Sequence, residues 1–213
     1  MYIQELWRYP VKSMAGQSLK KADLGPNGIR GDRVLQIRDG RGRMVTSRSH
    51  PALLSHRGTL GPDGEPLVDG RPWASPEVGR DVEIAAGAGA RIFRDEAPER
   101  FDVLPLLVAT EGAVEAFGYD RRRLRPNILI GGVKGLAERE WEGYRLCIGE
   151  VVIELVDLRE RCIMTTFDPD TQVQDVEVLR KIRRDFGGKL ALNARVLRGG
   201  TVRLRESLEL LHP

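Results

Sequence analysis

The chain has 213 residues, 41% of them hydrophobic, and its 34 Lys and Arg against 31 Asp and Glu leave a formal net charge of +3. This length and composition suit one large domain or two small ones with a hydrophobic core, and they exclude intrinsic disorder as the main state. Two cysteines, Cys147 and Cys162, and three histidines are too few for a disulfide framework or a zinc cluster, and they leave few candidates for catalysis by histidine.

Short apolar segments follow one another along the chain and predict strands. Residues 58–80, rich in Gly, Pro and Asp, are expected to form long hairpin loops. Two helices are predicted, one after Thr110 as its N-cap and one that begins after Asp175 and ends at Gly187. Many short strands with few helices favour a mainly β fold, a β-barrel, over a sheet of βαβ units. In chain order the expected strands are residues 2–8, 34–38, 82–86, 127–130, 144–148, 151–156, 191–197 and 202–204.

Charge is distributed unevenly along the chain. Residues 1–57 carry 11 basic and 4 acidic side chains, residues 58–120 carry 5 and 13, and residues 121–213 carry 18 and 14. Because arginine grips phosphate and carboxylate groups through a planar fork, the two basic segments could converge on one anion. A nucleic-acid partner is not expected, since the net charge is small and only 12 residues are aromatic.

The expected domain boundary and location also follow from composition. The acidic middle segment gives way to an apolar run near residues 97–101, which predicts two domains, residues 1–98 and 99–213. No signal-peptide core precedes them, and no apolar run approaches the length of a membrane span. We therefore expect a cytoplasmic protein in a reducing compartment, without a membrane partner.

Cys162 is the residue whose sequence context points to chemistry. Phosphate-binding, dinucleotide-binding, calcium-loop, serine-hydrolase and zinc-protease motifs are absent. Cys162 lies where a strand is expected to end, and it follows Arg159 and Arg161, whose positive charge favours a thiolate. Cys147, flanked by apolar residues within a strand, is interpreted as a packing residue. A single thiolate could ligate a metal whose other ligands come from an anionic organic cofactor.

Seven segments of the chain form a recognisable set: residues 9–16, 28–33, 44–48, 123–128, 141–143, 162–171 and 186–196. Together they resemble the MOSC family, named for the C-terminal domain of molybdenum cofactor sulfurase. The N-terminal half resembles the β-barrel extension of its longer members, so the resemblance implies a MOSC-like barrel plus a smaller N-terminal β-barrel region. Those longer members are similar to the amidoxime-reducing component and its bacterial relatives, which bind molybdenum pyranopterin and reduce N-oxygenated substrates.

The resemblance also implies roles for single residues. Cys162 matches the catalytic cysteine that ligates molybdenum beside the pterin dithiolene. Glu160 departs from the family pattern, in which a serine is frequent, and an acid beside an anionic cofactor would be repulsive unless it points away or pairs with Arg159. The residues that match cofactor-binding positions are Lys12, Ser13 and Arg33, at the phosphate and pterin, together with Arg125, Asn127 and Asn193.

Two functions are compatible with these expectations. The first is a molybdenum-dependent oxidoreductase that reduces N-hydroxylated or N-oxygenated small molecules with electrons from a separate donor protein. The alternative is a carrier that delivers the molybdenum cofactor, or its terminal sulfur, without turnover of its own. Both use the same pocket residues, so the sequence alone leaves the choice between them open.

Overall fold

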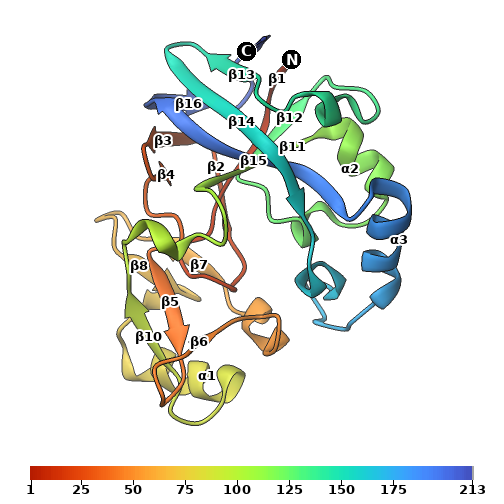
Figure 1. Ribbon diagram of the computed structural model, residues 1–213. Coiled ribbons are helices and arrows are strands. Elements are labelled where there is room, and N and C mark those ends of the chain that lie inside the picture. Colours follow the sequence, from red (N-terminus) through yellow and green to blue (C-terminus); the bar gives the residue numbers. More distant parts are fainter. Residues whose placement is uncertain (213) are drawn as a thin grey trace.

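The computed structural model describes residues 1–212, which form a mainly β fold with three α-helices (Figure 1). Its largest sheet has eight strands in the order β17-β13-β14-β15-β11-β12-β1-β2, and three smaller sheets have the orders β10-β5-β6, β16-β3-β4 and β7-β8-β9. The strands are β1 (Tyr2–Arg8), β2 (Gln17–Leu19), β3 (Lys21–Gly25), β4 (Gly28–Ile29), β5 (Leu35–Arg38), β6 (Met44–Val45), β7 (Gly58–Leu60), β8 (Pro66–Val68), β9 (Arg71–Pro72), β10 (Arg91–Arg94), β11 (Leu106–Thr110), β12 (Ile128–Gly131), β13 (Arg145–Ile148), β14 (Val151–Glu160), β15 (Lys189–Arg198), β16 (Gly200–Arg203) and β17 (Glu209–Leu211). The helices are α1 (Pro76–Ala86), α2 (Glu111–Phe117) and α3 (Val176–Phe186), with short 3-10 helices η1 (Pro51–Ser55), η2 (Pro98–Arg100), η3 (Arg121–Arg123), η4 (Ala137–Glu140) and η5 (Ile163–Thr166).

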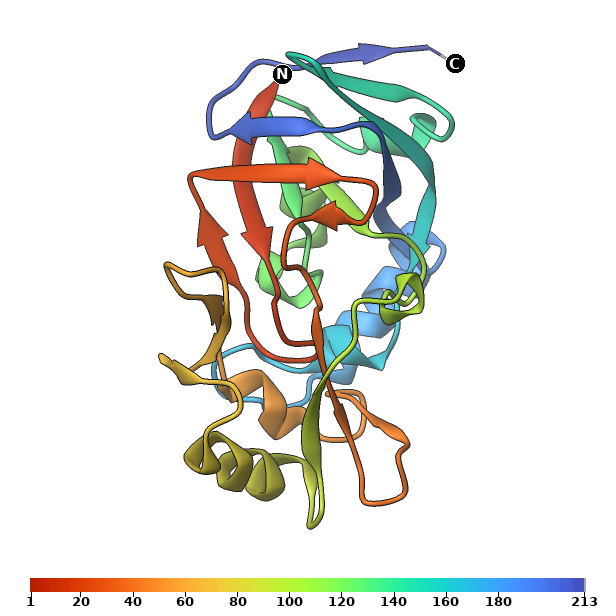
Figure 2. The same ribbon diagram turned by 90° about the vertical axis from the view of Figure 1, so that its left-hand side faces the viewer.

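The mainly β class is confirmed, but the sheets do not close into a barrel. Within residues 1–212 no strand ladder joins β2 to β17, the two edges of the large sheet. The chain ends are linked instead by an isolated antiparallel bridge between Tyr2 and Ser207, beside a hydrogen bond of 2.9 Å from Ile3 N to Glu206 O. Figure 2 shows both termini at the same end of the molecule.

Two separate hydrophobic clusters form in different parts of the fold. The larger one packs buried residues of β1 and β3, such as Leu6 and Leu24, against the strands of the C-terminal half. The other lies around α1 and β5 and includes Val11 and Met14 from the loop after β1. In Figure 1, α1 and β5, around which this second cluster packs, are at the lower end, and the large sheet and α2 are at the upper end. The division into residues 1–98 and 99–213 stays a prediction. Strand β1, from the first of these segments, pairs with β12, from the second.

The predicted strand at residues 82–86 is wrong, because these residues form the last half of α1. Helix α1 begins after Ser75, whose side chain accepts a hydrogen bond from Val78 N, with Pro76 in its first turn. Val82 is fully buried whereas Ile84 is 84% exposed, so the apolar residues do not share one face as they would in a strand. The buried positions Val78, Val82, Ala85 and Ala86 have the spacing of one helix face.

The other two helices are confirmed. Thr110 caps α2 by accepting from Ala113 N, Asp175 caps α3 by accepting from Glu177 N, and Gly187 ends α3 in the left-handed conformation. Strand β11 was not among the expected strands, although it lies centrally in the large sheet between β12 and β15. No helix within residues 1–212 is both long and apolar enough for a membrane crossing.

Candidate functional site

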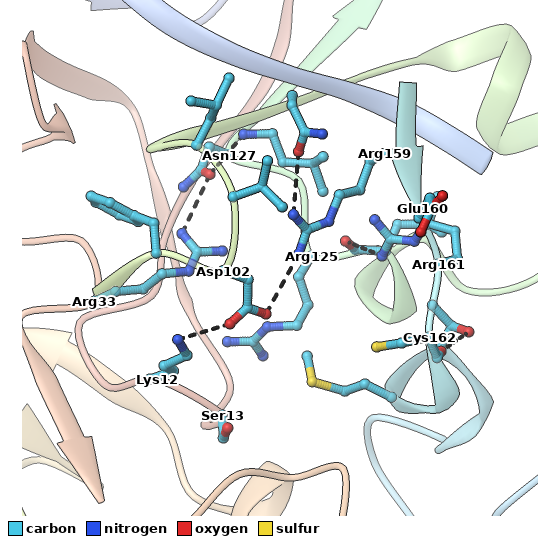
Figure 3. A pocket seen from close by; sticks show the side chains of 18 of the residues that line it. Lys12, Ser13, Arg33, Asp102, Arg125, Asn127, Arg159, Glu160, Arg161 and Cys162 are labelled. Carbon is cyan, nitrogen blue, oxygen red and sulfur yellow. Dashed lines mark hydrogen bonds and ion pairs between the residues drawn. The ribbon is translucent and has the colours of Figure 1, made fainter. Parts of the chain in front are cut away.

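The structure brings all seven predicted site residues to one pocket (Figure 3). The pocket lies where loops of the N-terminal half meet the start of β11, the end of β14 and the middle of β15. Lys12 and Ser13 come from the loop after β1, Arg33 from the turn before β5, Arg125 and Asn127 from the segment between η3 and β12, Cys162 from the N-cap of η5, and Asn193 from β15.

Cys162 is an exposed thiol at the start of η5, immediately after β14 ends. Its backbone carbonyl accepts hydrogen bonds from Thr165 N at 3.1 Å and Thr165 Oγ1 at 2.9 Å, which fixes the turn that presents the side chain. Cys147 lies in β13, away from this pocket. The structure therefore separates the two cysteines as the sequence analysis expected.

Cationic side chains surround the thiol. Arg48, Arg159 and Arg161 line the pocket together with Cys162. Burial opposes the charge of Arg48, but Asp102 and the Cys162 sulfur outweigh it and raise the pKa of Arg48. Burial lowers the pKa of Arg159, with Asp102 and Cys162 acting in the opposite direction. These cations give the part of the pocket around Cys162 a positive electrostatic potential, which suits an anionic ligand.

Arg125 is a buried cation without a hydrogen-bond partner. Its side chain is 8% exposed, and its guanidinium carbon lies 4.2 Å from the centre of the Tyr9 ring. No hydrogen bond from this guanidinium to any of residues 1–212 is present, and burial lowers its pKa to about 10. Since a buried charge is costly unless it is paired, the position fits an anionic ligand.

Three of the predicted site residues have left-handed backbone conformations. The φ angles are +74° at Ser13, +53° at Arg33 and +56° at Arg125. This conformation is uncommon for residues other than glycine, and such strain of about 1–3 kcal/mol is concentrated at functional sites. The backbone is therefore shaped to aim these side chains at the pocket rather than to satisfy local preference.

Asn127 supports Arg33 from behind. Its amide oxygen accepts from Leu107 N at 3.1 Å and from Arg33 at 3.4 Å, while its amide nitrogen donates to Trp7 O and to Asp32. These four bonds use the full capacity of the side chain. Asp32 is fully buried and also pairs with Arg33, so the two polar side chains together orient the guanidinium.

Asn193 has a similar place beside Arg159. Its amide nitrogen donates to Asp157 at 2.7 Å, and its oxygen accepts from Arg159 at 3.4 Å. Glu160 is exposed at the pocket edge and makes no ion pair within residues 1–212. Arg159, the partner considered for Glu160, pairs instead with Asp102.

Asp102 is the pocket residue that sequence reasoning missed. It lies in the irregular segment between η2 and β11, directly after the expected domain boundary, and it forms ion pairs with Lys12, Arg48 and Arg159. A single acidic residue in an irregular segment forms no recognisable sequence motif, so the sequence analysis did not select it. The available signal was its position beside the apolar run that becomes β11.

Comparison with known families finds a matching domain in each half of the chain. Residues 1–76 match the MOSC N-terminal beta barrel domain, and residues 108–209 match the MOSC domain. The chain is a MOSC-domain protein.

Three relatives place this MOSC-domain protein among known sequences and folds. "Mitochondrial amidoxime-reducing component 1" of Homo sapiens is 26% identical over an alignment 246 residues long, in which 85% of this chain and 72% of that protein are covered. "Molybdenum cofactor sulfurase" of Bombyx mori is 36% identical over 80 residues, 38% of this chain and 10% of that protein. The crystal structure of the YUAD protein from Bacillus subtilis has a TM-score of 0.51 at 14% identity, with 100% of this chain and 96% of that chain covered, and it supports the fold alone.

Proposed function

We propose that this MOSC-domain protein is a molybdenum-dependent oxidoreductase that reduces N-hydroxylated or N-oxygenated small molecules. The observation that carries the proposal is the convergence, in one pocket, of the exposed Cys162 thiol with a buried, unpartnered Arg125 guanidinium. The name of the human relative, an amidoxime-reducing component, supports the choice of substrate class.

The donor set fits molybdenum pyranopterin. Within residues 1–212 no group of three or more His, Cys, Asp and Glu side chains could hold a metal ion. A metal at Cys162 would therefore need further ligands from an organic group, and the dithiolene of a pyranopterin supplies two sulfurs. The cations that line the same pocket match the phosphate of such a group.

Each pocket residue has a distinct part in this proposal. Cys162 would ligate the metal, Lys12, Ser13, Arg33 and Arg125 would bind the phosphate and pterin, and Asn127 and Asn193 would act at the cofactor by orienting Arg33 and Arg159. When bound, the cofactor supplies a two-electron redox centre. Reduction of an N-hydroxyl group consumes two electrons and two protons and releases water. The exposure of Cys162 leaves the reacting side of the pocket open to substrate and to solvent protons.

The partners and location belong to the same proposal. The electrons come from a separate donor protein, since the 213 residues contain only two cysteines and an iron–sulfur cluster is typically held by four. We place the reaction in the cytoplasm, with a small molecule as substrate and with neither nucleic acid nor membrane as partner.

Metal loading tests the proposal directly. The protein is produced in a host that synthesises the cofactor, and its molybdenum and pterin contents are measured alongside two serine variants. We expect Cys162→Ser to keep its fold but to lose most of its molybdenum and its reductase activity, because the thiolate ligand is gone. Cys147→Ser is the matched control and should keep both. A Cys162→Ser protein with full molybdenum content and full activity would contradict the proposal.

A carrier function is the second candidate. The match to molybdenum cofactor sulfurase from Bombyx mori favours it, because the name of that relative describes an enzyme whose substrate is the cofactor itself. A chemical electron donor and an amidoxime separate the two functions. Sustained turnover by fully loaded protein excludes a pure carrier, and stoichiometric loading without turnover excludes the reductase.

A further inference from the structure

The carboxylate of Asp102 occupies the centre of the cation cluster in the pocket. Its Oδ1 atom lies 2.8 Å from Lys12 Nζ, and its Oδ2 atom lies 2.6 Å from an Arg48 nitrogen and 3.5 Å from an Arg159 nitrogen. Figure 3 shows the carboxylate between Lys12 and Arg159. One acidic side chain thus neutralises cations from three separate parts of the chain.

The segment that carries Asp102 is anchored at both ends and loose between them. Phe101 is buried, with the guanidinium carbon of Arg100 4.3 Å from its ring centre, and Leu106 is buried at the start of β11. Between these anchors, the backbone N–H groups of residues 102–104 make no hydrogen bonds within residues 1–212. Val103 is 53% exposed. Asp102 can therefore swing away without the loss of a backbone hydrogen bond.

Two of the three cations, Lys12 and Arg159, have a second hydrogen-bond partner that orients the side chain independently of Asp102. Lys12 also donates to the carbonyl of Arg100 at 2.8 Å, and Arg159 donates to Asn193 at 3.4 Å. These neutral partners hold both side chains toward the pocket. A phosphate group offers several oxygens to the cluster and pairs with arginine through charge-assisted hydrogen bonds, so it is a stronger partner than one carboxylate.

We infer that Asp102 is a built-in counterion that holds Lys12, Arg48 and Arg159 before a ligand arrives and that an incoming anionic group displaces it. The inference rests on the proposed function for the nature of that group, a phosphate. Asp102 therefore lowers the affinity of the pocket for anions and keeps weakly bound anions out. A residue that merely positioned the cations would raise that affinity instead, so the two roles have opposite signs.

Titration calorimetry with inorganic phosphate at constant ionic strength measures this sign. The full chain is produced in a host that does not synthesise the cofactor, and wild type is compared with Asp102→Asn. Loss of one carboxylate in direct contact with three cations should tighten phosphate binding about tenfold. Asp95→Asn is the matched control, because Asp95 lies close by in the chain but pairs with Arg38 outside the pocket. The control should bind phosphate as wild type does.

The outcomes separate this inference from the proposed function. Equal or weaker phosphate binding by Asp102→Asn overturns the inference alone, and so does a gain of the same size in Asp95→Asn. Absence of phosphate binding by both wild type and Asp102→Asn overturns it together with the proposed phosphate subsite. If wild type binds phosphate but contains no molybdenum when it is produced in the host that synthesises the cofactor, the proposed function alone is overturned.

A structure of wild type with bound phosphate gives a second readout that needs no variant to fold. We expect the Asp102 carboxylate to have left Lys12 and Arg159 while phosphate oxygens contact both. Phosphate bound in the pocket with all three Asp102 ion pairs retained would overturn the inference.

Discussion

Glu138 is a fully buried carboxylate that joins three elements. Its Oε2 atom accepts from Thr110 N at 2.9 Å, at the end of β11, and its Oε1 atom accepts from Ala191 N at 3.0 Å, in β15. Ala191 has a φ of +67°, so its N–H points away from the regular ladder and toward the carboxylate. Burial raises the pKa of Glu138 from 4.5 to about 7 in spite of these hydrogen bonds.

The raised pKa of Glu138 makes stability depend on pH. Because the folded-state pKa lies above the unfolded value, the folded state binds the proton more tightly, and its stabilisation is fully present below about pH 4.5. It is lost as the pH rises through about 7, by at most about 1.4 kcal/mol per pH unit. Glu138→Gln should lower the free energy of unfolding by about 1–3 kcal/mol, because the glutamine NH2 group cannot accept one of the two backbone hydrogen bonds. The difference from wild type should shrink as the pH rises, because only wild type loses stability when Glu138 ionises.

Urea unfolding across this pH range measures the effect. Glu140→Gln is the control, because Glu140 is an exposed residue of the same 3-10 helix, η4. It should leave both stability and its pH dependence near those of wild type. A Glu138→Gln protein with the same pH dependence as wild type would contradict the expected titration of Glu138.

At the scale of elements, two substitutions in α1 test whether residues 82–86 form a helix or the strand that their apolar alternation predicted. Val82 is fully buried and Ile84 is 84% exposed. Val82→Thr places a hydroxyl in the core and should lower the free energy of unfolding by about 1–3 kcal/mol. Ile84→Thr should change it by less than about 0.5 kcal/mol. Chemical denaturation of both variants checks this pair, and equal losses would indicate that the two residues share one buried face.

At the scale of the whole molecule, the two halves share one hydrophobic cluster. Strand β1 pairs with β12, and β3 pairs with β16, so strands from the first 25 residues complete sheets of the C-terminal half. The N-terminal members of the shared cluster are Ile3, Leu6, Ala22, Leu24 and Ile29. Residues 99–213 by themselves would leave the facing apolar surface open to water.

We therefore expect residues 99–213, produced alone, to lack a cooperative thermal transition and to bind a hydrophobic dye. The full chain, measured in parallel by circular dichroism, should unfold with a sharp transition. A sharp transition in the isolated segment would show that the C-terminal half folds without β1 and β3.

Sequence periodicity was sufficient where a short element carries its own signal. Strand β1 and the capped helices α2 and α3 were predicted because alternation, cap residues and terminal glycines are local features. It failed at α1 because a short run of Val, Ile and Ala has no unambiguous period. It missed β11 because a strand that is buried on both sides shows no alternation, and all five of its residues are buried.

The sequence by itself determined the residue types of the site. Cys162 could be selected without coordinates because of the arginines beside it, and the Arg125-Pro126-Asn127 segment because it resembles a motif of the MOSC family. The tertiary structure alone decided which cations are already paired. It showed that Arg125 is buried without a partner and that Asp102 neutralises Lys12, Arg48 and Arg159. The physical reason is that burial and ion pairing depend on distances between segments far apart in the chain, and no local pattern records those distances.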